Sequence, residues 1–127
     1  MKKIIKLIKD MDKKRKVEFI ICYGSYLTQK KTPMSDIDIA IFYEGDKKER
    51  FDFRMKLLGF AKDKYDIQTF QDLPLYLRAE ILKKGKIIFI KESKKVSSIA
   101  IETIREYESF RKYYDLYINS IEGVKIA

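Results

Sequence analysis

The sequence predicts an α+β fold: a four-stranded mixed β-sheet with helices packed mainly on one face, and a long C-terminal helix. Short stretches rich in β-branched and aromatic residues alternate with segments of helical periodicity. Turn-forming residues such as Gly24, Gly45 and Gly85 lie between these segments. From about residue 94 to about residue 120, apolar residues recur every three or four positions, which predicts a single long helix.

The length of 127 residues fits one domain, with a core at about 17–90 and the C-terminal helix at about 94–120. Hydrophobic residues make up 46% of the chain, which is enough to form a core. No apolar run approaches the roughly 18 residues that a membrane span needs. Cys22 is the single cysteine, so no internal disulfide can form. We therefore expect a cytoplasmic protein without a membrane partner.

The formal net charge of +9 favours an acidic partner such as a nucleotide, a nucleic acid or an acidic protein surface. The lysines are spread over the whole chain, however, and such a charged surface is also typical of heat-adapted proteins. Histidine is absent, which excludes histidine-dependent nucleophile systems and histidine-based zinc sites. Any metal must bind carboxylates, which indicates Mg²⁺ or Mn²⁺.

The first elements are a helix and a strand. Residues 3–11 have helical periodicity, and a basic loop at residues 13–16 follows them. Residues 17–23 (VEFIICY) predict a buried strand that ends at Gly24. The apolar side of the first helix is formed by Ile4, Ile8 and Met11.

The second strand carries acidic residues on one side. Residues 25–35 predict a short helix followed by a loop. Residues 36–43 (DIDIAIFY) alternate along a strand, so that the isoleucines share one side and Asp36 and Asp38 share the other. We expect the isoleucine side to meet the helices and the acidic side to line an open cleft.

The remaining elements alternate between helices and strands. Residues 48–62 predict a helix, residues 65–70 a third strand, and residues 87–90 a fourth. Pro74 opens a short helix that Gly85 ends. The expected apolar side of the 48–62 helix is Phe51, Met55, Leu58 and Ala61, flanked by Leu57. The stripe of the last helix is Val96, Ile99, Thr103, Tyr107, Phe110, Tyr114, Tyr117 and Ile121.

The chemistry of the chain is concentrated at Gly24-Ser25 and Asp36-Ile37-Asp38. Two carboxylates at i and i+2 on a strand share a face, about 7 Å apart at the backbone, and can converge on a pair of cations. Two metals about 3.5–4 Å apart stabilise the attacking and leaving oxygens of an in-line displacement. A Gly-Ser turn lets the backbone approach a phosphate closely, and the Ser25 hydroxyl can donate a hydrogen bond to it.

Plainer interpretations exist for each residue. Asp36 and Asp38 could form the solvated face of an edge strand. Gly24 could be an ordinary turn at the end of a strand.

These residues resemble the signature of the polymerase-beta-like nucleotidyltransferase superfamily, specifically its minimal nucleotidyltransferase (MNT) group. The segment GSYLTQKKTPMSDIDIAI is similar to that group in spacing and in its hydrophobic frame, and the resemblance extends from Val17 to about Ile90. It implies a third metal-binding carboxylate on a later strand, for which Asp66 matches by position. Asp63 lies close by but is expected in the preceding turn. For Asp66 the plainer alternative is a polar strand edge shared with Gln68.

The resemblance also implies an activity. Asp36, Asp38 and Asp66 would be the catalytic and metal-binding residues for two Mg²⁺ ions, with Mn²⁺ as an alternative, and Gly24 and Ser25 would bind the phosphates of ATP or another nucleoside triphosphate. The nucleoside monophosphate would pass to a hydroxyl. MNT proteins resemble antitoxins whose partner is a HEPN-type toxin, and a tyrosine of that toxin would be the acceptor.

Two non-catalytic alternatives stay open. The lysines at 13–16, with Lys30 and Lys31, could belong to a module that binds nucleotide or RNA, although no RNA-binding motif is present. The chain could also neutralise a toxin by binding alone. The aromatic stripe of the last helix could pack over the chain's own domain or form an interface with a partner.

Overall fold

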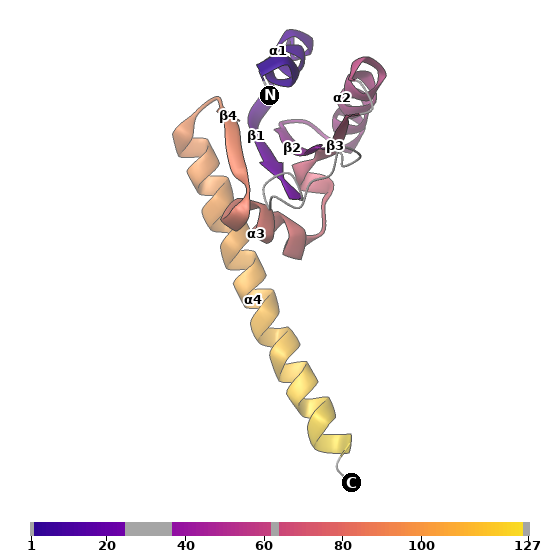
Figure 1. Cartoon of the computed structure of the whole chain (residues 1–127). Helices are drawn as coiled ribbons and strands as arrows, with labels where there is room; N and C mark the ends of the chain where they lie inside the picture. The colour runs from indigo at the N-terminus through magenta and orange to yellow at the C-terminus, as the bar shows by residue number, and fades with distance from the viewer. Residues whose placement is uncertain (1, 25–36, 62–63, 126–127) are drawn as a thin grey trace.

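The computed structural model describes residues 2–24, 37–61 and 64–125, with the side chains of the last helix described as far as residue 121. Four strands form one mixed sheet in the order β3-β2-β1-β4, in which β2 and β3 are parallel and the other neighbours are antiparallel (Figure 1). This architecture, with its long last helix, confirms the predicted fold class. The elements are α1 (Lys2–Met11), β1 (Val17–Tyr23), β2 (Ile37–Tyr43), α2 (Lys47–Phe60), β3 (Tyr65–Thr69), η2 (Phe70–Asp72), α3 (Leu75–Lys84), β4 (Lys86–Ile90) and α4 (Ser93–Lys125).

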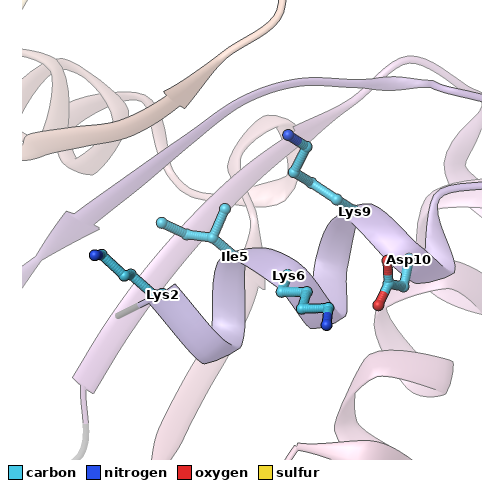
Figure 2. A pocket seen from close by; sticks show the side chains of 5 residues that line it. All are labelled: Lys2, Ile5, Lys6, Lys9 and Asp10. Carbon is cyan, nitrogen blue, oxygen red and sulfur yellow. The ribbon is translucent and has the colours of Figure 1, made fainter.

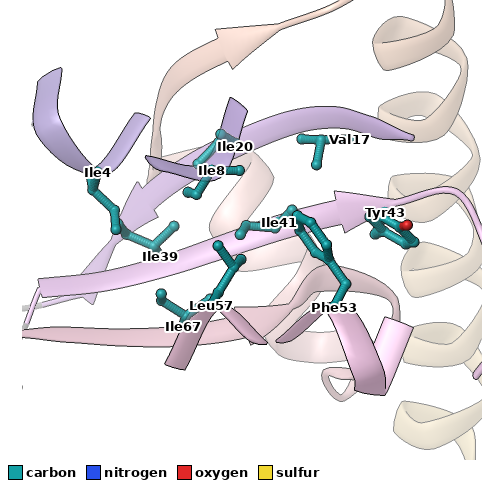
Figure 3. Close-up of a cluster of buried hydrophobic side chains, with 10 residues drawn as sticks. All are labelled: Ile4, Ile8, Val17, Ile20, Ile39, Ile41, Tyr43, Phe53, Leu57 and Ile67. Atoms are coloured by element: carbon teal, nitrogen blue, oxygen red, sulfur yellow. The ribbon is translucent and has the colours of Figure 1, made fainter. Parts of the chain in front are cut away.

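One face of the sheet is covered by α1 and α2. As predicted, Ile4 and Ile8 of α1 are buried, and they pack against the isoleucine side of β2 (Figure 3). Removing this much aliphatic surface from water is the main contribution to stability on this side. The buried members of the cluster are Ile4, Ile8, Val17, Ile20, Ile39, Ile41, Tyr43, Phe53, Leu57 and Ile67.

The buried side of α2 differs from the prediction. Phe53 and Leu57 point into the core, whereas Phe51 is 57% exposed and Met55 47% exposed. Leu58 and Ala61 pack only at the border of the cluster. Apolar residues lie on several sides of this helix, so periodicity alone could not select the buried one. The choice comes from tertiary contact, because the ring of Phe53 stacks on that of Tyr43 at a centroid distance of 4.4 Å.

The opposite face of the sheet is also covered, by α3 and α4. Phe19 and Ile21 of β1 and Ala40 of β2 pack there against Ile81 of α3 and Val96 of α4. The helices are therefore divided between the two faces, which differs from the expectation that they lie mainly on one. The reason lies in β1, a central strand that is apolar on both sides and must be buried on both.

A buried carboxylate anchors the start of α4. Glu18 of β1 is only 2% exposed, and its Oε1 lies 3.0 Å from Lys91 Nζ and 3.4 Å from Lys95 Nζ. Lys95 also forms an ion pair with Glu44. The other oxygen, Glu18 Oε2, has no hydrogen-bond partner among the described residues. The two lysines therefore provide the compensation that makes this burial tolerable.

We expect the double substitution Lys91→Met/Lys95→Met to lower the free energy of unfolding by about 2–4 kcal/mol, because it leaves a buried carboxylate without a cation. Glu18→Gln should cost less, since both lysines are partly exposed and can be hydrated. Urea unfolding would measure both changes, with the exposed Lys94→Met as the control. A loss in the double variant no larger than that of Lys94→Met would show that Glu18 does not depend on the lysines.

The last helix packs against the body only along its first half. Val96 and Thr103 are buried, whereas six large apolar side chains of the second half are exposed, namely Phe110, Tyr113, Tyr114, Leu116, Tyr117 and Ile121. Figure 1 shows this second half extending beyond the sheet and the other helices. Packing over the chain's own domain thus explains the first half of the predicted stripe and not the second. Among the described helices, none is long and apolar enough to cross a membrane.

Candidate active site

Three polar side chains form a row across the sheet. Asp38 of β2 is directly opposite Tyr23 of β1 on one side and Asp66 of β3 on the other. Residues that are paired across neighbouring strands point to the same face of a sheet. The structure therefore brings together two of the three carboxylates that the sequence singled out. The end of the sheet where β1 ends and β2 and β3 begin is called the acidic end below.

The carboxylates of Asp38 and Asp66 lie side by side on the same face of the sheet, where their negative charges repel each other. Neighbouring strands are about 4.8 Å apart, and like charges directly opposite each other are destabilising. Both side chains are partly buried. Gln68 donates a hydrogen bond from Nε2 to Asp66 Oδ1 at 3.1 Å, which restricts the orientation of that carboxylate. A divalent cation between the two groups would offset their repulsion, and carboxylate oxygens are the ligands that Mg²⁺ prefers.

Gly24 closes the row at the end of β1. Its φ of 80° lies in the left-handed region, which favours glycine. A Cβ atom at this position would lie 2.1 Å from Asp38 Oδ2, so a side chain cannot be added unless that carboxylate moves. Both the conformation and the space require glycine here. Gly24 is therefore more than an ordinary turn at the end of a strand, because its lack of a side chain lets the Asp38 carboxylate lie against its backbone.

Tyr23 is a member of the row that the sequence did not identify as a site residue. Burial, and then the negative charges of Asp38 and Asp66, raise the pKa of its phenol to about 12. The hydroxyl therefore stays protonated at neutral pH. Its neighbour Cys22 is buried, and burial followed by the charge of Asp38 raises the pKa of its thiol, which makes it a poor nucleophile. Alternation along β1 places Tyr23 on one side, but only the pairing register shows that Asp38 lies beside it.

Two of the predicted site residues, Ser25 and Asp36, lie outside the described residues, as does the predicted short helix and loop at 25–35. Within residues 2–24, 37–61 and 64–125, no three acidic or cysteine side chains gather into a metal-binding group. The described part thus contains two of the three predicted metal ligands. Asp63 also lies outside the described residues.

Two hollows on the described surface lie away from this row. One of about 340 Å³ runs along α1 and is lined by Lys2, Ile5, Lys6, Lys9 and Asp10 (Figure 2). Another of about 680 Å³ lies between α1 and α2 and includes Lys13, Lys14, Tyr43 and Phe60. Both belong to the helices on the face opposite to Asp38.

The basic segment at 13–16 is partly used within the fold. Lys16 Nζ lies 2.7 Å from Glu49 Oε2, and this pairing raises the pKa of Lys16 and lowers that of Glu49. Lys13 and Lys14 line the larger hollow. Lys30 and Lys31 lie outside the described residues. The observed geometry therefore gives the RNA-binding alternative no added support.

Comparison with known proteins identifies the family. Residues 2–94 match the family described as polymerase beta, nucleotidyltransferase. A relative from Methanocaldococcus jannaschii, which carries the name protein adenylyltransferase, is 36% identical over 99 residues that cover 78% of this chain and 70% of the relative. The chain belongs to the polymerase beta nucleotidyltransferase family and is a nucleotidyltransferase.

The fold is similar to that of chains in solved toxin–antitoxin complexes. A chain from a toxin–antitoxin structure with AMP-PNP superposes with a TM-score of 0.73 at 24% identity, covering 95% of this chain and 97% of that one. A chain from the complex of a tri-AMPylated Shewanella oneidensis HEPN toxin with its MNT antitoxin gives 0.68 at 24% identity, with coverages of 95% and 94%. These likenesses confirm the MNT fold.

Proposed function

We propose that this chain is a Mg²⁺-dependent adenylyltransferase that transfers AMP from ATP to a tyrosine hydroxyl of a HEPN-type toxin and so acts as its antitoxin. The observation that carries the proposal is the row at the acidic end, in which Asp38 and Asp66 lie side by side and Gly24 is fitted against Asp38. The family provides the reaction class. The names of the relatives support AMP as the group transferred and a toxin as the partner.

The carboxylates fit a divalent metal. Asp36 and Asp38 would share one side of their strand, and Asp66 would contribute from β3. Bound Mg²⁺ would neutralise charge on the reacting phosphates and on the attacking oxygen. The hydrogen bond from Gln68 would restrict the orientation of the Asp66 carboxylate while it binds the metal. The chain's own contribution is thus to hold several negative charges where a cation stabilises them.

The nucleotide would bind beside these acids. Because Gly24 has no side chain, the Asp38 carboxylate lies directly against its backbone, and a metal held by Asp38 would be close to the turn where the phosphates would bind. The Ser25 hydroxyl would donate a hydrogen bond to a phosphate oxygen. In this arrangement Gly24 and Ser25 hold the β- and γ-phosphates, and the α-phosphorus faces the acids.

Transfer requires positioning more than a covalent enzyme intermediate. The acceptor oxygen would attack the α-phosphorus, the bond from that phosphorus to the bridging oxygen would break, and pyrophosphate would leave. Asp66 would accept the proton of the acceptor hydroxyl. Tyr23, which stays protonated, is a hydrogen-bond donor at the other end of the row.

Label transfer tests the proposal directly. The purified chain with Mg²⁺ and α-³²P-ATP should label a purified HEPN-fold protein from the same genome, whereas γ-³²P-ATP should not. Replacing the acceptor tyrosine by phenylalanine should abolish labelling. Stable binding of the two proteins without any label would instead favour neutralisation by binding alone. RNA binding that weakens steeply with salt, without turnover, would favour the nucleic-acid module.

A further inference from the structure

The second half of α4 is an amphipathic helix whose apolar side contacts solvent. Phe110 is 56% exposed, Tyr113 76% and Leu116 66%, and the ring of Phe110 stacks on Tyr114 within the same helix. The charged residues of this stretch lie on the opposite side of the helix. The apolar set is Phe110, Tyr113, Tyr114, Leu116, Tyr117 and Ile121, called the distal surface below, and the charged set is Glu108, Arg111, Lys112 and Asp115.

The distal surface is wider than a single helix can cover. At about 100° per residue, Phe110, Tyr114 and Ile121 lie close together, while Tyr113 and Leu116 widen the apolar arc to about 160°. A coiled-coil seam with one partner helix uses a narrower stripe. An arc of this width is suited to a groove between helices, in which an amphipathic helix is gripped from more than one side.

The distal surface begins close to the acidic end of the sheet. β4 runs from Lys86, opposite Cys22, to Ile90, opposite Phe19, so α4 begins at the end of the sheet remote from the acids. The helix then runs back toward the acidic end along the face of the sheet that α3 also covers. At the end of α3, Lys83 Nζ lies 3.5 Å from Glu108 Oε1 and 5.6 Å from the ring centroid of Tyr107. The helix therefore leaves the body at the acidic end, and Figure 1 shows the distal half continuing beyond it.

We infer that the distal surface is the docking site of the protein that carries the acceptor hydroxyl, a helical protein with a groove for α4. The inference rests on the proposed function. A protein bound along this segment lies next to the acidic end, where its hydroxyl can reach the α-phosphorus. A second copy of the chain is a poorer occupant, because each copy carries a net charge of +9 and a pair of α4 helices leaves part of the arc uncovered. The same charge favours a partner with an acidic surface.

The double substitution Tyr114→Glu/Tyr117→Glu tests this inference. It places two charges midway along the length of the distal surface and changes the net charge by the same amount as the control Lys112→Glu, which lies on the charged side. With a purified HEPN-fold protein as acceptor, the double variant should raise the acceptor KM at least tenfold. Affinity for Mg-ATP and the thermal unfolding temperature should match those of wild type, and the control should transfer AMP normally.

The possible outcomes distinguish a loss of docking from a loss of AMP transfer. An acceptor KM within twofold of wild type in the double variant would overturn the inference and leave the proposed function standing. Sedimentation equilibrium that showed a wild-type dimer lost in the double variant would assign the surface to a second copy and also overturn it. If wild type binds the HEPN-fold protein without transferring AMP and the double variant does not bind it, docking is supported while the proposed function fails.

Discussion

Asp38→Asn is expected to reduce nucleotidyl transfer by about 10³-fold or more and to leave the fold intact, because it removes a charge from the metal-binding row without changing the shape of the side chain. Together with Asp36→Asn it should abolish turnover. Because asparagine has nearly the same shape as aspartate, the variant should still fold and unfold cooperatively. Rates of AMP transfer at saturating Mg²⁺ and urea unfolding curves would measure the two effects.

The matched control for this variant is Asp10→Asn. Asp10 is exposed on α1, on the other side of the sheet, and the change removes the same charge from the chain. Its activity should stay within about twofold of wild type. Comparable losses in Asp38→Asn and Asp10→Asn would mean that net charge, and not the row of acids, determines the rate.

Gly24→Ala is expected to damage the site and the fold together. The new Cβ would lie 2.1 Å from Asp38 Oδ2, so the carboxylate must move, and a displacement of about 1 Å can lower a rate about 10²-fold. The φ of 80° adds a conformational cost of about 1–3 kcal/mol for alanine. Activity assays below the unfolding temperature, together with denaturant titration, would separate the two losses.

Gly59→Ala provides the control for Gly24→Ala. Gly59 lies within α2, and a Cβ there has no atom within 4 Å. This substitution should stabilise the protein by about 0.5–1 kcal/mol and leave activity unchanged. Full activity in Gly24→Ala would show that the close approach to Asp38 has no role in the reaction.

Most of the secondary structure could be predicted because local signals agree with the fold. The strand at 17–23 has the predicted bounds, and the short third helix lies between Pro74 and Gly85 as predicted. The buried side of α2 could not be predicted, because several of its sides are apolar and stacking of Phe53 on Tyr43 selects one. The covering of both sheet faces depends on strand order, which makes β1 central.

The candidate site, too, could be predicted from the sequence only in part. Side-chain type and spacing singled out Gly24, Asp38 and Asp66, and the described geometry places them at one end of the sheet. Their roles stay a proposal, as do those of Ser25 and Asp36. Tyr23 was missed because its neighbours come from the pairing of β1 with β2, which no local pattern specifies. The stripe of α4 was seen in the sequence, but the point at which it leaves the body depends on the extent of α3 and the sheet.

Whether Asp38 and Asp66 bind a shared cation can be measured in a crystal structure with Mn²⁺ and a non-hydrolysable ATP analogue, in which anomalous scattering locates the metal. Manganese is expected about 2–2.5 Å from carboxylate oxygens of both Asp38 and Asp66, with the phosphates against Gly24. Carboxylates that diverge or pair with lysine or arginine side chains, with manganese bound elsewhere, would contradict it.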